Sequence, residues 1–290
     1  MLFPESRLAL EAAADDTPVF AEGYDVAAAR AEARRAAAAE PREDVARVED
    51  VDADGVPARL YTPEGLRGPG VIVHAHGGGF VFNDVAVHDA SARRLANRAG
   101  RRVLSVDYRR PPEHRFPAAV DDVSAASDWA GRALAGPLLA HGDSAGGNLA
   151  LVTALRHPGR FRAVALIYPF LDPTAGFDSY RTAADGFDPR EAAWYWQQYA
   201  ASPADLADPD LAPLLSDRLG TLPPTLVVTA EHDPLRDEGE ELARRIAEEG
   251  VEVTATRYLG QLHGFWRHPR AFPSAEPLMR QVAGFLRIHG

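Results

Sequence analysis

Two amino acids are missing from this 290-residue sequence, which contains no cysteine and no lysine. Without cysteine the protein can form no disulfide bond, use no thiol nucleophile and bind no metal through thiolates. All 31 basic residues are arginines, and 42 acidic residues outnumber them, so the formal net charge is −11. An acidic chain of this kind is poorly suited to nucleic acid or to an anionic membrane surface. We therefore expect neither among its partners.

Long apolar runs are also missing. No stretch approaches the roughly 20 apolar residues that a membrane-spanning helix needs. The first seven residues, MLFPESR, lack the basic and apolar regions of a secretion signal. A soluble, cytoplasmic protein is the expectation, and the sequence leaves open whether it is a monomer or a homodimer. The length and the 46% hydrophobic content suit one large α/β domain with a sizeable core.

Apolar runs typical of buried strands alternate with segments of helical period from about residue 71 onward. This alternation predicts an α/β fold with a mostly parallel central sheet flanked by helices. Its strands are expected at 71–75, 103–106, 137–140, 163–167, 226–229 and 251–258, after a hairpin at 45–51 and 56–62. Helices are expected at 89–99, 117–134, 148–156, 235–249 and 277–288.

Two segments stand outside this alternation. Residues 1–40 have the pattern of two helices with a break near Pro18, and Asp25 is positioned to cap the second. Residues 170–222 are rich in proline, aspartate and aromatic residues, and they are too many for a structureless loop. We interpret residues 1–40 as N-terminal lid helices, and residues 41–290 as a core with a lid insertion at about 170–222.

A candidate nucleophile lies in the stretch Gly142-Asp143-Ser144-Ala145-Gly146, which fits the pattern G-x-S-x-G. An apolar strand precedes it and an amphipathic helix follows, as in the sharp turn that presents a serine above the end of a strand. The glycines leave room where strand and helix nearly touch. Short matches of this kind also arise by chance, so Ser144 needs partners to be convincing.

A serine hydroxyl becomes a good nucleophile when a base lies within hydrogen-bond reach and a third group orients that base. Asp233 directly follows the strand at 226–229, and His263 follows the last strand. Polar residues at the carboxyl ends of parallel strands meet at one edge of the sheet. We therefore expect Ser144, Asp233 and His263 to form a catalytic triad. The alternatives for base and acid are less well placed, and they are His157, His232, His268, His289 and Asp237.

The run His76-Gly77-Gly78-Gly79-Phe80 follows the strand at 71–75. Successive glycines let the backbone approach a substrate and aim N–H groups at the negative charge that develops in acyl transfer. We expect Gly78, Gly79 and Ala145 to donate in such an oxyanion hole. A phosphate-binding loop would need a lysine that is absent, and no carboxylate at ligand spacing accompanies the histidines 74 and 76. We expect no metal.

These motifs make the chain similar to the hormone-sensitive-lipase-like family of bacterial carboxylesterases, which has the α/β-hydrolase fold. The segments 108–109, 112–118 and 233–239 add to the resemblance. It implies a helical lid at the N-terminus and hydrolysis of short- to medium-chain esters without a cofactor. The chain departs from the family pattern at Arg110-Pro111 and at Asn83, beside the expected oxyanion hole.

Five aromatic residues are candidates for the substrate pocket: Phe80, Phe82, Trp194, Trp196 and Trp266. For the two tryptophans of the expected lid, packing between lid and core is the simpler reading. An apolar pocket for the acyl or alcohol group is the alternative, and the sequence does not separate the two.

Three functions remain open. The first is a serine carboxylesterase that works through an acyl-enzyme on small-molecule esters. The second is a hydrolase dedicated to a lactone or an acetylated natural product. The third is a non-catalytic receptor for small molecules on the same fold. Such a receptor commonly lacks a triad member, whereas this sequence retains candidates for all three, which favours an enzyme.

Overall fold

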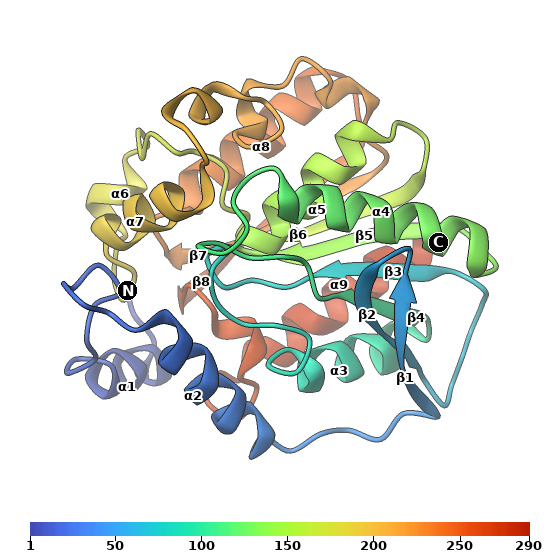
Figure 1. Cartoon of the computed structure of the whole chain (residues 1–290), viewed down its shortest axis with the longest axis horizontal. Helices are drawn as coiled ribbons and strands as arrows, with labels where there is room; N and C mark the ends of the chain where they lie inside the picture. The colour runs from blue at the N-terminus through green and yellow to red at the C-terminus, as the bar shows by residue number, and fades with distance from the viewer.

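A computed structural model describes all 290 residues and contains one eight-stranded sheet. Its strands run in the order β1-β2-β4-β3-β5-β6-β7-β8 (Figure 1). Their bounds are β1 Arg47–Ala53, β2 Val56–Thr62, β3 Val71–Ala75, β4 Arg102–Val106, β5 Leu138–Asp143, β6 Phe161–Ile167, β7 Thr225–His232 and β8 Val253–Leu262. The pairs β1·β2 and β2·β4 are antiparallel and the remaining pairs are parallel. The expected mostly parallel sheet is thus confirmed.

Helices cover both faces of the sheet, which explains why strands such as β3 are buried along their whole length. One face carries α3 (Asp89–Ala99) and α9 (Ala275–His289), whose apolar sides share a core cluster with Ile72 and Leu139. The other face carries α4 (Ala118–Ala133), α5 (Ala145–Arg156) and α8 (Arg236–Glu248), as Figure 1 shows. The alternation read from the sequence therefore corresponds to three layers, helix, sheet and helix.

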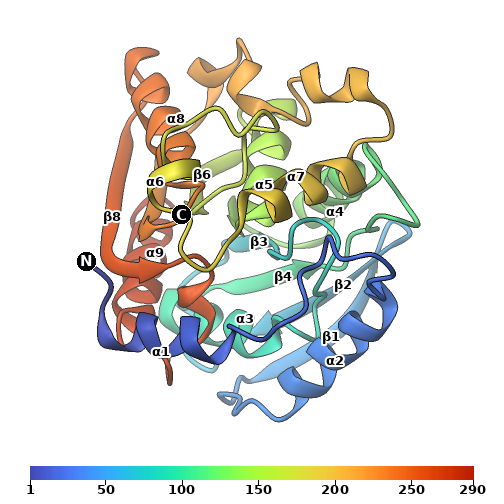
Figure 2. The same ribbon diagram turned by 90° about the vertical axis from the view of Figure 1, so that its left-hand side faces the viewer.

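The remaining helices gather at one end of the sheet (Figure 2). They are α1 (Pro4–Ala12) and α2 (Val26–Ala38) from the N-terminal segment, and α6 (Ser179–Thr182) and α7 (Pro189–Tyr199) from the insertion. Short 3-10 turns complete the chain at Pro203–Ala207, Pro213–Leu215, Leu219–Thr221 and Phe265–Arg267.

The N-terminal segment is tied to the core by hydrogen bonds. Asp25 caps α2 by accepting from Ala28 N at 2.9 Å, as the sequence predicts. The Ser6 hydroxyl donates to the Gly260 carbonyl at 2.7 Å, which joins α1 to β8 across 254 positions of sequence. Arg30 on α2 donates to the Val81 carbonyl at 2.9 Å, next to the glycine run. None of the helices combines the length and the apolar character required to cross a bilayer.

Candidate active site

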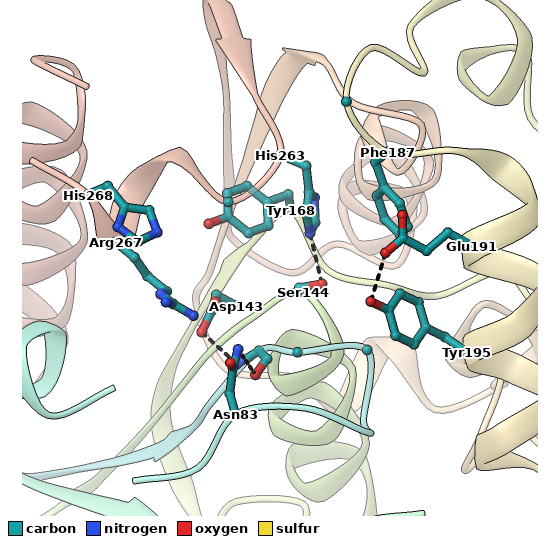
Figure 3. Close-up of a pocket in the computed structure, with 15 residues that line it drawn as sticks. Asn83, Asp143, Ser144, Tyr168, Phe187, Glu191, Tyr195, His263, Arg267 and His268 are labelled. Carbon is teal, nitrogen blue, oxygen red and sulfur yellow. Dashed lines mark hydrogen bonds between the residues drawn. The ribbon is translucent and has the colours of Figure 1, made fainter. Parts of the chain in front are cut away.

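Ser144 occupies the sharp turn between β5 and α5, with φ 54° and ψ −123°. A positive φ is unfavourable for a residue with a side chain, so the surrounding structure must hold it in place. Gly142 and Gly146 make this possible, because a Cβ at Gly142 would collide with the Gly146 carbonyl and one at Gly146 with the Ala75 carbonyl. The turn lifts the Ser144 side chain into a cavity at the carboxyl ends of the strands (Figure 3).

The structure brings Ser144, His263 and Asp233 into one hydrogen-bonded chain. Ser144 Oγ lies 3.0 Å from His263 Nε2, and His263 Nδ1 lies 2.7 Å from Asp233 Oδ2. The fully buried Asp233 is held in place because its Oδ1 accepts from Leu235 N at 2.9 Å. A carboxylate can only accept, so the His263 proton sits on Nδ1 and Nε2 is free to take a proton from Ser144.

The alternative acid and bases make other contacts. Asp237 accepts from Ser179 N at 2.8 Å and pairs with Arg236, so it orders the start of α8. His232 bonds to Asp185 at 2.8 Å, and His268 lies 3.7 Å from Glu40. None of these three side chains forms a hydrogen bond with Ser144 Oγ.

The glycine run forms a tight loop beside Ser144. Gly78 and Gly79 have φ of 126° and 57°, and a Cβ on Gly79 would overlap the Tyr195 ring. Their N–H groups donate to no acceptor within the protein. Free N–H groups at the rim of a catalytic cavity suit a developing oxyanion. Ala145 opens α5 beside the serine, where the helix terminus favours negative charge.

Two side chains fix this loop through the backbone N–H and the backbone carbonyl of Gly77. Gly77 N donates to Asp143 Oδ1 at 3.0 Å, and Asn83 Nδ2 donates to Gly77 O at 3.1 Å. Asn83 itself has φ 63°, a conformation that asparagine tolerates. Arg110 donates to the Asn83 carbonyl and lies 3.8 Å from Asp84. The departures at positions 83 and 110 therefore brace the expected oxyanion hole.

A cavity of about 230 Å³ surrounds Ser144, and polar and apolar atoms line it in similar amounts. Only three of its fifteen lining residues are hydrophobic, and these are Tyr168, Phe187 and Tyr195. Charged or polar side chains at its wall include Asn83, Asp143, Glu191, Arg267 and His268 (Figure 3).

None of the five aromatic candidates for the pocket lines this cavity. Phe80 is buried and stacks on Tyr199 with ring centroids 3.8 Å apart, and Trp196 packs on Phe170 at 4.3 Å. Trp266 is buried among histidines in the core.

Phe82 and Trp194 are half-buried and stack on each other with centroids 6.1 Å apart. The face of α7 that meets the cavity carries Glu191 and Tyr195, one turn apart. The structure thus assigns packing to the tryptophans, and sequence reasoning missed Glu191. A helical-wheel reading of α7 places Glu191 beside Tyr195, but it does not say which face meets the cavity.

Four fully buried histidines lie beneath the catalytic turn: His74, His76, His88 and His141. Burial lowers the pKa of His74 to about 4 and that of His76 to about 3. It holds the pKa values of His88 and His141 well below the usual value. These imidazoles are therefore neutral, and His74 Nδ1 lies 2.9 Å from His141 Nδ1.

Three groups in this region could offer ligand atoms to a metal, namely His74, His88 and Asp143, with atoms within 4.8 Å of one another. Asp143 Oδ1 is already engaged by the Gly77 N–H. Neither histidine reaches the catalytic cavity. The hydrogen bonds around Ser144 can be explained without a metal ion at His74, His88 and Asp143.

The buried histidines make stability depend on pH. Their depressed pKa values mean that the unfolded chain takes up protons below pH 6.5 while the folded protein does not. We expect the free energy of unfolding to fall as the pH drops from 6.5 to about 4, with each such histidine contributing about 1.4 kcal/mol per pH unit. Urea titrations at several pH values measure this slope.

His74→Phe should reduce that slope by about 1.4 kcal/mol per pH unit, which corresponds to one proton fewer taken up on unfolding. The matched control is His114→Asn, because His114 is exposed and its replacement should leave the slope unchanged. A slope that is insensitive to His74→Phe would contradict the explanation.

Comparisons with known proteins agree with this geometry. Residues 72–267 match a protein family described as having the alpha/beta hydrolase fold. Carboxylic ester hydrolase LipN of Mycobacterium tuberculosis is 40% identical over 265 residues, which span 83% of this chain and 70% of that protein. Ethyl acetate hydrolase of Pseudomonas putida is 34% identical over 255 residues, spanning 82% of this chain and 80% of that protein.

A solved structure is similar over nearly the whole chain. The hyperthermophilic esterase from the archaeon Pyrobaculum calidifontis superimposes with a TM-score of 0.90 at 37% identity, covering 99% of this chain and 98% of that one. The family match covers most of the chain, and the similarity extends through the sheet and its carboxyl-end loops. The chain therefore belongs to the α/β-hydrolase family, and within it to the hormone-sensitive-lipase-like carboxylesterases.

Proposed function

We propose that this carboxylesterase cleaves short- to medium-chain esters through an acyl-enzyme on Ser144, with His263 as general base and acid and Asp233 as the group that orients it. The hydrogen-bonded chain from Ser144 Oγ through His263 to Asp233 carries the proposal. A neutral His263 with Nε2 facing the hydroxyl is the arrangement that activates a serine.

The reaction proceeds in two halves. Ser144 Oγ attacks the ester carbonyl carbon while His263 Nε2 takes its proton, and the carbonyl oxygen becomes an oxyanion beside Gly78 and Gly79 N–H. His263 returns the proton to the departing alcohol oxygen, which leaves the acyl group on Ser144. Water then attacks the acyl carbon with His263 again as base. The acid departs as Ser144 regains its proton.

Residues 1–40 and about 170–222 act as the lid in this proposal. From the insertion, Gly186, Phe187, Glu191 and Tyr195 line the cavity. From the N-terminal segment, Phe20 and Tyr24 line a neighbouring cavity that shares Gly186, Phe187 and Glu191 with the catalytic one. Both segments therefore lie where they can limit the size of the substrate.

The small volume of the cavity favours short acyl chains, as the name of the ethyl acetate hydrolase relative also suggests. Each buried methylene contributes about 0.8 kcal/mol until the pocket is full, and overpacking then reverses the gain. Across 4-nitrophenyl esters from acetate to dodecanoate, we expect kcat/KM to peak at a short chain and to fall beyond it. A preference for long-chain emulsified lipids would contradict this.

Tyr195→Ala should enlarge the cavity and move the peak towards longer chains. Trp194 packs on Phe82 outside the cavity, so Trp194→Ala should lower stability and leave the peak in place. A peak that moves with Trp194→Ala alone would reverse the roles assigned to these residues. Lactones and acetylated metabolites in the same screen test for a dedicated substrate.

A further inference from the structure

Arg267 is a cation in the catalytic cavity without a carboxylate partner. It ends the 3-10 turn that follows His263, is half-buried and lines the same cavity as Ser144 (Figure 3). Its Nη1 donates to His88 Nε2 at 3.2 Å. No carboxylate oxygen lies within 4.0 Å of its guanidinium nitrogens. Several other half-buried arginines of this chain are paired with carboxylates, for example Arg98 with Glu43 and with Glu276.

No carboxylate in direct contact balances the charge of Arg267. Burial and the positive charge of Arg267 itself hold the pKa of His88 well below the usual value, so this imidazole is a neutral acceptor. Asp143 shares the cavity, and its Oδ1 accepts the Gly77 N–H. Burial has the larger effect on the pKa of this carboxyl and raises it, whereas the charge of Arg267 lowers it. A guanidinium that is partly removed from water without an anion carries a desolvation cost that a bound anion would offset.

A second cavity continues the positive region on the other side of Arg267. It has a volume of about 210 Å³, shares Arg267 and His268 with the catalytic cavity, and is also lined by Arg94 and Arg270. Arg94 is nearly fully buried, and it too has no carboxylate within 4.0 Å. Glu40 is the one acidic residue in this lining.

The opposite wall of the catalytic cavity carries a carboxyl group. Figure 3 shows Glu191 on the far side of Ser144 from Arg267. Tyr195 OH donates to Glu191 at 2.9 Å, and burial raises the pKa of this carboxyl. An anionic group on a substrate is therefore drawn to the Arg267 wall, because the lining around Glu191 and Tyr195 offers it no cation.

From these observations we infer that Arg267 binds an ionised carboxylate on the substrate, so that the enzyme selects small esters that carry a second, free carboxyl group. This inference rests on ester hydrolysis at Ser144, since it concerns the part of the substrate that does not react. Arg267 is a specificity-determining residue, and its planar N–H groups can hold a carboxylate with two parallel hydrogen bonds.

Two matched pairs of esters test the inference in the wild-type enzyme. Monomethyl succinate against methyl pentanoate places the carboxylate on the acyl part, and 2-acetoxypropanoate against sec-butyl acetate places it on the alcohol part. Acid release in a pH-stat gives kcat/KM for each. We expect the ionised ester to be preferred about tenfold or more in at least one pair, the effect of a charged hydrogen bond. Preference for the neutral ester in both pairs would overturn the inference.

Substitutions then assign the preference to the side chain. In Arg267→Gln the ratio of kcat/KM for ionised over neutral ester should fall about tenfold or more, mainly through a higher KM for the ionised ester. Arg267→Lys keeps the positive charge but loses the planar guanidinium, so its ratio should lie between those of the wild type and Arg267→Gln. The control is Arg162→Gln, which removes the same charge from an exposed residue near the start of β6 and should leave the ratio unchanged.

The outcomes separate this inference from the catalytic proposal. If neutral esters are hydrolysed and Ser144→Ala abolishes the reaction, but the ratio is the same in wild type, Arg267→Gln and Arg267→Lys, the selectivity inference is wrong and the mechanism stands. If no ester of either kind is hydrolysed, the catalytic proposal itself fails. Thermal melting of each variant shows whether the protein is folded during the assay.

Discussion

Replacement of Ser144 by alanine is expected to lower kcat for ester hydrolysis by about 10⁴-fold or more while the protein stays folded. The hydroxyl supplies the attacking oxygen, and no neighbouring side chain can replace it in hydrogen-bond contact with His263 Nε2. Alanine preserves the close packing of the turn, because it removes one atom and adds none. Initial rates with 4-nitrophenyl acetate measure the loss, and circular dichroism with thermal melting confirms the fold.

Ser274→Ala provides the matched control for this substitution. Ser274 precedes α9 and its side chain makes no capping hydrogen bond, so the same chemical change should leave turnover intact. If Ser144→Ala retained a tenth of the wild-type activity, the nucleophile would have to be sought elsewhere.

Replacement of Asp233 by asparagine is expected to lower kcat by about 10³- to 10⁴-fold, with a much smaller effect on KM. The Asp233 carboxylate accepts the proton on His263 Nδ1 at 2.7 Å and stabilises the imidazolium that forms during the reaction. An asparagine amide can donate to Nδ1 instead. That would place the His263 proton on Nε2, where it blocks proton transfer from Ser144.

The same substitution at Asp237 tests whether the loss of turnover depends on the position of the carboxylate or only on the loss of a negative charge. Asp237 binds Ser179 N and Arg236 at the start of α8 and does not contact His263. Asp237→Asn should cost about 1 kcal/mol of stability and less than tenfold in turnover. The opposite order of effects on turnover would show that the wrong carboxylate has been assigned.

The arrangement of the sheet, the helices and the proposed catalytic residues could be predicted because it depends on short-range patterns. Apolar runs and helical periods place the strands, and the carboxyl ends of parallel strands share one edge of the sheet. Asp233 and His263 were identifiable because each follows such a strand. In the structure they lie together with Ser144, although 119 positions separate Ser144 from His263.

The cavity wall could not be predicted, because it depends on how loops that are distant in sequence pack together. Tyr195 reaches Gly79 only because α7 lies over the glycine loop with one particular face. A helical pattern shows which residues share a face, but not what that face meets. Arg267 reads as an ordinary surface arginine in sequence, and only the turn after His263 brings it into the cavity. The cavity wall therefore combines aromatic rings with charged side chains such as Glu191 and Arg267, in place of the five aromatic residues considered from the sequence.

Labelling with an organophosphate, followed by peptide mass spectrometry, tests the central claim most directly, because such a reagent adds to an activated serine. The account predicts a single adduct on the peptide that contains Ser144, with loss of esterase activity in proportion to labelling. His263→Ala should slow the labelling strongly, because the hydroxyl then lacks its base. Full loss of activity with the adduct on any other serine, or with Ser144 unmodified, would contradict the account.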